Sequence, residues 1–303
     1  MASAMTLKKI VSSFLQGLGA FVAFVVALIV SSLIVPIPQN ILNARPEAGF
    51  LVSPMDFLLN GAANGLIMVW AARRSSLKGL AMLAQLTVLS FGVQVFMTQI
   101  ETAYFLPSFP LLKGNFELYR IVLRGFLTSV LFAGMVTLLT GGFSGKIRLQ
   151  TAFSVTTHRA VRSGAWIALI YVILYFIFGY FVAWQWQDVR LFYGGSAELN
   201  SFFDQMRRTL MERPEIPVFQ YFRGVLWMLC LIPLFLGFSG KRVELMVVSG
   251  LTLALLPTAQ LSFPNPLMPA NVSLAHFYEV SLSTGFFGAL CAWFVPEDVH
   301  TTK

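Results

Sequence analysis

The 303-residue chain has few charged residues and only two cysteines. Asp, Glu, Lys and Arg make up 11% of it, whereas hydrophobic residues make up 57%. A chain this poor in charge cannot cover a water-facing surface, so a soluble globular protein is excluded and lipid is the expected solvent. The two cysteines, Cys230 and Cys291, fall inside apolar segments, which excludes a disulfide framework and a Cys-rich metal site.

Long apolar windows recur along the chain. A helix needs about 20 residues to cross roughly 30 Å of hydrocarbon, and continuous rather than alternating apolar runs indicate helices, not barrel strands. The sequence therefore predicts an all-α, polytopic transmembrane helical bundle of about eight spans, forming a single integral membrane domain over residues 1–303. The expected spans lie near residues 10–35, 56–72, 78–100, 121–141, 164–184, 221–238, 242–261 and 272–294.

Basic residues are distributed unevenly between the two sides that these spans create. With the N-terminus inside, twelve of the 21 bases and three acids fall on the inner side, a net charge of +9, while nine acids balance nine bases outside. Because Lys and Arg in short loops resist translocation, both termini are predicted to be cytoplasmic. The net positive charge of the inner side is better explained by attraction to an anionic inner leaflet than by binding to nucleic acid, so no nucleic-acid partner is expected.

The longest polar stretch is the predicted outer loop, residues 185–220. Its apolar residues share one helical face and its charged residues lie elsewhere, which is typical of an amphipathic helix. This helix could lie on the outer leaflet or cover the mouth of the bundle. The apolar face comprises Leu199, Phe202, Phe203, Met206 and Leu210.

Polar and ionisable residues inside the predicted spans mark a candidate site, since each is costly in hydrocarbon. They fall in the outer half of their spans or at the outer boundary, and they form stripes at helical spacing. Two interpretations stay open: hydrogen-bonded pairs that hold helices together, such as Glu101 with Arg124 or Glu279 with Arg223, or an outward-facing pocket for a polar or charged solute. The candidate site consists of Asp56, Asn60, Glu101, Arg124, Arg223, His276 and Glu279.

His276 and Glu279 could also act chemically, because residues three apart on a helix point the same way and could share a metal or a proton. The chain has no His-Glu-x-x-His pattern and no Gly-x-Ser-x-Gly elbow. Its two Gly-Lys pairs lack the glycine five positions earlier that a phosphate loop needs. We therefore assign no catalytic residue, no metal ligand and no cofactor from the sequence.

One short segment occurs twice. Arg124-Gly125 precedes a GFSGK segment at residues 142–146, and Arg223-Gly224 precedes the same segment at 237–241. The distance in sequence from the arginine to the lysine is 22 residues in the first case and 18 in the second. The difference of four residues is about one helical turn. Both segments run in the same direction, so the echo suggests a parallel duplication of a helix-pair unit.

Two parts of the chain, YFVAWQ (180–185) with FYGG (192–195) and PNPLMP (264–269) with AHFYE (275–279), resemble an uncharacterised family of bacterial multi-span membrane proteins. The resemblance implies a bacterial cytoplasmic membrane and carries over no catalytic residue. The leading hypothesis is a transporter-like binder of a small polar solute, or an accessory subunit with a membrane-protein partner. The alternative is an intramembrane or interfacial hydrolase that uses His276 and Glu279.

Overall fold

The computed structural model describes residues 2–44, 54–112, 115–144, 157–263 and 266–295, and within them the fold is all-helical, as the sequence predicts. The candidate spans in this described part number seven by length and hydropathy. They are formed by α1 (Ala2–Ile34), α3 (Pro54–Arg74), α4 to α5 (Leu80–Tyr104), α6 (Asn115–Leu139), α7 with its π-helical end (Thr157–Ala183), α10 (Glu215–Gly237), and α11 with the following 3-10 turn (Arg242–Ser262).

The eighth expected span forms helix α12 (Ala270–Phe294), which has 25 residues but is not among the seven. The physical reason is its polar stripe, because Ser273, His276, Glu279 and Ser283 lower its hydropathy. Three of these four are buried in the bundle. Side chains that face protein need not be apolar, so hydropathy alone underestimates such a helix.

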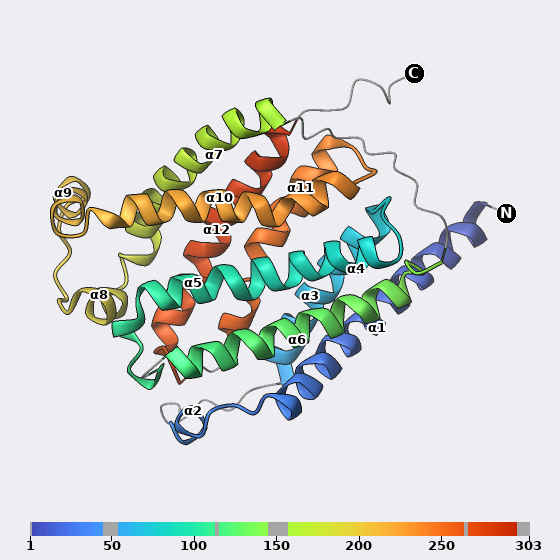
Figure 1. The fold of residues 1–303 in the computed structure, drawn as a ribbon, viewed down its shortest axis with the longest axis horizontal. Helices are drawn as coiled ribbons and strands as arrows, with labels where there is room; N and C mark the ends of the chain where they lie inside the picture. Colours follow the sequence, from blue (N-terminus) through green and yellow to red (C-terminus); the bar gives the residue numbers. More distant parts are fainter. Residues whose placement is uncertain (1, 45–53, 113–114, 145–156, 264–265, 296–303) are drawn as a thin grey trace.

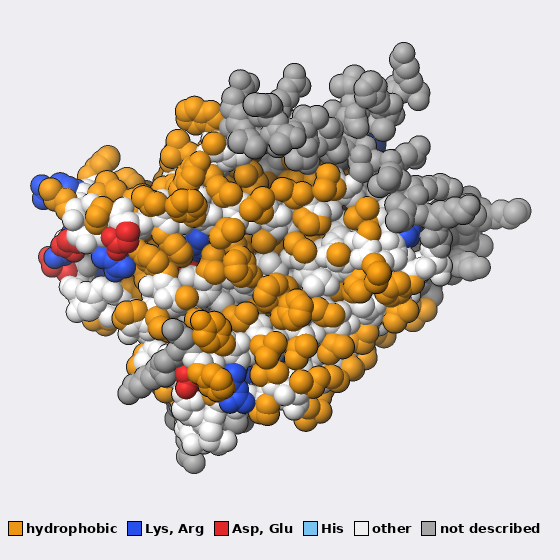
Figure 2. Space-filling model, in the orientation of Figure 1, with side chains coloured by type: hydrophobic (Ala, Val, Ile, Leu, Met, Phe, Trp, Pro, Cys, Tyr) orange, Lys and Arg blue, Asp and Glu red, His pale blue; other side chains and the backbone are white. Residues whose placement is uncertain are grey.

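The long helices run between two ends of the bundle (Figure 1). One end carries α8 (Gln187–Gly194) and the amphipathic α9 (Phe202–Glu212), and we call it the α9 end. The other holds the N-terminus of α1 and the turns after α3, α6 and α10, and we call it the basic end because Arg73, Arg74, Lys78 and Lys241 lie there. Figure 2 shows apolar side chains covering most of one face and charges of both signs gathered around α9.

The eight long helices form two groups of four with the same order and the same packing. The first half is α1, α3, α4 to α5 and α6; the second is α7, α10, α11 and α12. In each half the first helix packs against the second and the fourth, and the third packs against the fourth. Between halves, α3 contacts α11, and α10 contacts the segment from α4 to α5. These reciprocal contacts describe a two-fold relation about an axis along the bundle.

Similar side-chain contacts within each half support this two-fold relation. Gly61 of α3 lies against Phe21 of α1, and Gly224 of α10, 163 residues later, lies 2.9 Å (from an ideal Cβ) from the Cβ of Tyr171 of α7. Phe132 and Phe287 are both fully buried on the fourth helix of their half. Each contacts an aromatic ring on the first helix, Phe24 at 5.2 Å and Tyr171 at 4.9 Å between centroids.

The axis of the two-fold relation passes between two turns at the basic end. The backbone N–H of Ser76 donates to the carbonyl of Gly237 at 2.7 Å, and the N–H of Ser239 donates to the carbonyl of Arg74 at 2.8 Å. The two bonds are equivalent under the same shift of 163 residues. They form an antiparallel bridge between Ser75 and Phe238, which joins the halves.

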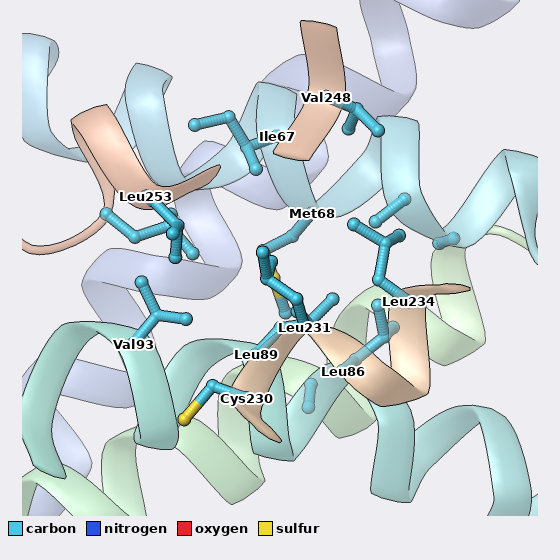
Figure 3. Close-up of a cluster of buried hydrophobic side chains, with 14 of the residues drawn as sticks. Ile67, Met68, Leu86, Leu89, Val93, Cys230, Leu231, Leu234, Val248 and Leu253 are labelled. Atoms are coloured by element: carbon cyan, nitrogen blue, oxygen red, sulfur yellow. The ribbon is translucent and has the colours of Figure 1, made fainter. Parts of the chain in front are cut away.

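The core lies along the contact between the halves. Figure 3 shows it as a cluster to which α3, α4, α10 and α11 all contribute. Ile67 and Met68 of α3 are equivalent, by the same shift, to Cys230 and Leu231 of α10. All four side chains are buried.

The repeated GFSGK segment does not reflect a pair of equivalent helices, because the two-fold relation matches α10 with α3 and α6 with α12. In the structure, the first glycine of each GFSGK segment has a packing role instead. Gly142 packs against Met82 and Gly237 packs against Gln85, so each small residue lets a turn approach α4. In addition, the N–H of Gly79 donates to the carbonyl of Gly142 at 2.8 Å.

Candidate functional site

A partly buried ion pair crosses the boundary between the halves near the α9 end. Arg223 of α10 donates through both terminal nitrogens to the carboxylate of Glu101 of α5, at 2.8 Å each. The arginine side chain is 4% exposed and the glutamate side chain 33%. Gln220, one turn earlier on α10, accepts from Arg223 at 2.9 Å. The pairing differs from both pairs considered from sequence, because Arg223 binds Glu101, whereas Glu279 lies beside His276.

Two donors at this pair have no partner within the described residues. They are the Nε of Arg223 and the amide nitrogen of Gln220, and both atoms are buried. Leaving a buried donor unpaired costs about 1–3 kcal/mol, and more for a charged group. The two donors therefore form a small region that favours an acceptor.

A π-helical segment, η1 (Val88–Phe96), precedes Glu101 and packs against α10. Here α10 approaches closely, because an ideal Cβ on Gly92 would lie 2.8 Å from the sulfur of Cys230. π-helical turns inside α-helices are frequent at functional sites. The segment sets the rotation of α5 relative to α10, and hydropathy gives no signal for it.

A second polar group lies on α12. The ring of His276 and the carboxylate of Glu279 are 3.6 Å apart, as their three-residue spacing predicts, and Glu279 is buried. The other ring nitrogen of His276 lies 3.1 Å from the hydroxyl of Tyr193 in α8. Ser283 donates weakly to Glu279 at 3.4 Å.

Helix α8 covers this second group. Its buried Arg190 donates to the carbonyls of Trp184, Gln185 and Ala197 at 2.7 to 3.0 Å, which fixes α8 to the segments on either side. Tyr193 lies on the same helix. The sequence placed these residues in an outer loop and offered no signal for Tyr193, whereas Gln220 could have been found from its three-residue spacing to Arg223.

Tyr193 connects the two groups. Its ring contacts Phe105, one turn after Glu101, at 5.6 Å between centroids, and contacts the His276 ring at 5.5 Å. Burial raises the pKa of the Tyr193 phenol, and the charges of Glu101 and Glu279 raise it further. The phenol thus stays protonated, and its hydroxyl bonds to His276 of the second group.

The remaining predicted residues lie elsewhere. On α3 the amide of Asn64 donates to the side-chain oxygen of Asn60 at 2.8 Å, and both are buried. Asp56 lies in the first turn of the same helix. Arg124 lies one turn before Thr128, whose hydroxyl is 2.6 Å from Ser31 of α1. Arg124 therefore lies on the α1 side of α6, away from the Glu101–Arg223 pair.

Another ion pair crosses the same boundary at the basic end. Arg74, at the end of α3, donates to Glu244 of α11 at 2.5 Å, and the indole of Trp70 donates to the same oxygen at 2.9 Å. Both boundary-crossing pairs thus join an arginine on the second helix of one half to a glutamate on the third helix of the other. One pair lies near each end of the bundle.

Among the described residues, no three His, Cys, Asp or Glu side chains come together as a metal-holding group. His276 and Glu279 remain a pair, without Glu101 or Asp56 as a third ligand. What the site offers chemically is recognition: a guanidinium, a carboxamide, a phenol and an imidazole around two carboxylates.

Comparison of the chain with protein-family models, with curated proteins and with solved structures found no match.

Proposed function

We propose that the protein is a membrane transporter for a small polar solute, bound near the α9 end at the contact between its two halves. The observation that carries the proposal is the partly buried Glu101–Arg223 pair, which crosses that contact while Arg223 and Gln220 each keep a donor unpaired among the described residues. A pair that only held helices together would need no spare donors. The solute is one that carries acceptor oxygens.

The two halves supply a means of movement. Transporters built from parallel repeats change access by moving one repeat against the other around a fixed site. In this chain the Glu101–Arg223 pair would close the α9 end and the Arg74–Glu244 pair the basic end. With both termini cytoplasmic in a bacterial inner membrane, the first pair faces outward.

A native cysteine tests the proposed movement. Cys230 is buried where α10 meets η1, so separation of the halves would expose it, whereas Cys291 is 1% exposed on α12 within the second half. Glu101→Gln weakens the pair at the α9 end. We expect a membrane-impermeant maleimide, added to proteoliposomes, to modify Cys230 about tenfold faster in this variant while Cys291 stays protected.

The matched control is Glu212→Gln, which removes the exposed Arg208–Glu212 pair on α9. It should leave the Cys230 rate unchanged. Equal, slow modification of Cys230 in wild type and Glu101→Gln would refute moving halves and favour a rigid accessory subunit. Modification of Cys291 together with Cys230 would show unfolding instead, and the proposed movement would then have no support.

A further inference from the structure

A large apolar cavity lies at the other contact between the halves, where α3 meets α11 and α12. Its volume is about 1060 Å³, and described residues between α11 and α12, together with η3 (Pro110–Leu112) and α8, also contribute to its walls. Pockets for small molecules usually have about 300–1,000 Å³. Most of the lining is hydrocarbon, and the cavity extends from the ends of the helices at the α9 end into the bundle.

The cavity arises from a difference between the halves. On α3 it is lined by Leu59, Ala62 and Ala63. The positions 163 residues later on α10 hold the larger Phe222, Val225 and Leu226. The two half-to-half contacts are therefore unlike: one holds the Glu101–Arg223 pair, and the other has space.

One polar side chain in the wall of this cavity has a hydroxyl without a partner among the described residues. Ser273, in the first turns of α12, lines the cavity and is 5% exposed. Its hydroxyl is buried and makes no hydrogen bond within the described residues. A buried hydroxyl without a partner is unfavourable. We therefore expect an occupant of the cavity that accepts a hydrogen bond from Ser273.

Two of the residues that line the cavity are exposed apolar side chains. Leu59 is 55% exposed and Leu274 is 42% exposed. Both are lining residues on helices that face the hydrocarbon of a bilayer. A chain can therefore enter from the lipid phase without crossing a polar surface, and an apolar space favours hydrocarbon over water.

From these features we propose that the cavity binds one acyl chain of a membrane phospholipid, with an ester oxygen accepting a hydrogen bond from Ser273. The chain would pass Ala62 and Ala63 towards Phe277. A lipid seated here occupies the contact between the halves and belongs to the site as a fixed component. This proposal does not depend on the protein being a transporter.

Photocrosslinking tests the proposal. The protein is reconstituted in vesicles of phosphatidylethanolamine and phosphatidylglycerol that contain a small fraction of phospholipid with a diazirine on its acyl chain. After irradiation, peptides are mapped by mass spectrometry. We expect cross-links concentrated on residues 59–63 of α3 and 273–277 of α12, well above those on the lipid-facing residues of α7.

Two variants separate a filled cavity from general contact with lipid. Ala62→Leu with Ala63→Leu fills the space and should lower cross-linking at these segments about tenfold, whereas Ala165→Leu, at an exposed position on α7, should not change it.

Ser273→Ala should weaken retention of the phospholipid in detergent about fivefold, as loss of one hydrogen bond predicts. Unchanged cross-linking after the space is filled, or label distributed evenly over the bundle, would overturn the proposal. A fatty alcohol that displaces the label better than unlabelled phospholipid would also overturn it.

Discussion

Arg223 shows how a charge can be retained inside a membrane bundle. Its side chain is almost fully buried, and the bidentate contact with Glu101 and the bond to Gln220 offset the cost of removing it from water. The sequence identified both charges, because any ionisable residue in a span is unusual. It could not identify the pairing, since that depends on α10, not α6, lying beside the charged face of α5.

At this scale we predict that the pair is more sensitive to one substitution than to two. Glu101→Gln leaves a buried guanidinium without its counter-charge and should destabilise the protein by about 3 kcal/mol. Glu101→Gln with Arg223→Met removes both charges and should recover most of that loss. The measurement is thermal unfolding in detergent. If the double variant is less stable than either single variant, the pair contributes more than the burial of its charges costs.

The long helices were predictable because each contains a charge-poor run long enough to span a membrane. Their ends were not, because polar residues shorten a hydropathy window: the span expected from residue 221 begins at Glu215, and Gln220 lies inside the helix. The π-helical segments η1 and η4 (Gly179–Ala183) left no trace in hydropathy. They alter only how the backbone turns, and the same side chains fit an ordinary helix.

Helix packing within a half can be tested at Gly224. A Cβ there would lie 3.1 Å from the backbone of Ala168 and 2.9 Å from Tyr171, so Gly224→Ala should separate α10 from α7 and cost about 1–3 kcal/mol. Gly134→Ala is the matched control, because its Cβ would meet only Leu83 at 3.9 Å. The control should be neutral or stabilised, since alanine favours helix. Equal unfolding temperatures would show that α7 and α10 do not approach this closely.

The relation between the halves belongs to the whole molecule, and the sequence shows little of it. Only scattered residues, such as Gly61 with Gly224, are alike at positions 163 residues apart. Packing in a bundle conserves volume and small contacts more than residue type, so apolar side chains interchange freely. The site residues differ between the halves: under the shift of 163 residues, Asn60 corresponds to Arg223.

Orientation is the prediction for the whole molecule. The excess of Lys and Arg at the basic end predicts that this end is cytoplasmic and that the α9 end faces outward. In intact cells an impermeant thiol reagent should label Glu198→Cys, and it should label Ser144→Cys only after the membrane is opened. Both positions are exposed, and the native cysteines are buried. Labelling in the reverse order would invert the topology and place the Glu101–Arg223 pair on the inner side.

Each half contains four long helices, an even number, and this has a consequence for biogenesis. A unit with an even number of crossings returns the chain to the side from which it began. The second half can therefore enter the membrane in the orientation of the first, and a single ancestral unit could be joined to its copy without an added helix. During synthesis the first half can complete its internal contacts before α7 emerges. The Ser75–Phe238 bridge then forms late, when the turn after α10 reaches a turn already in place.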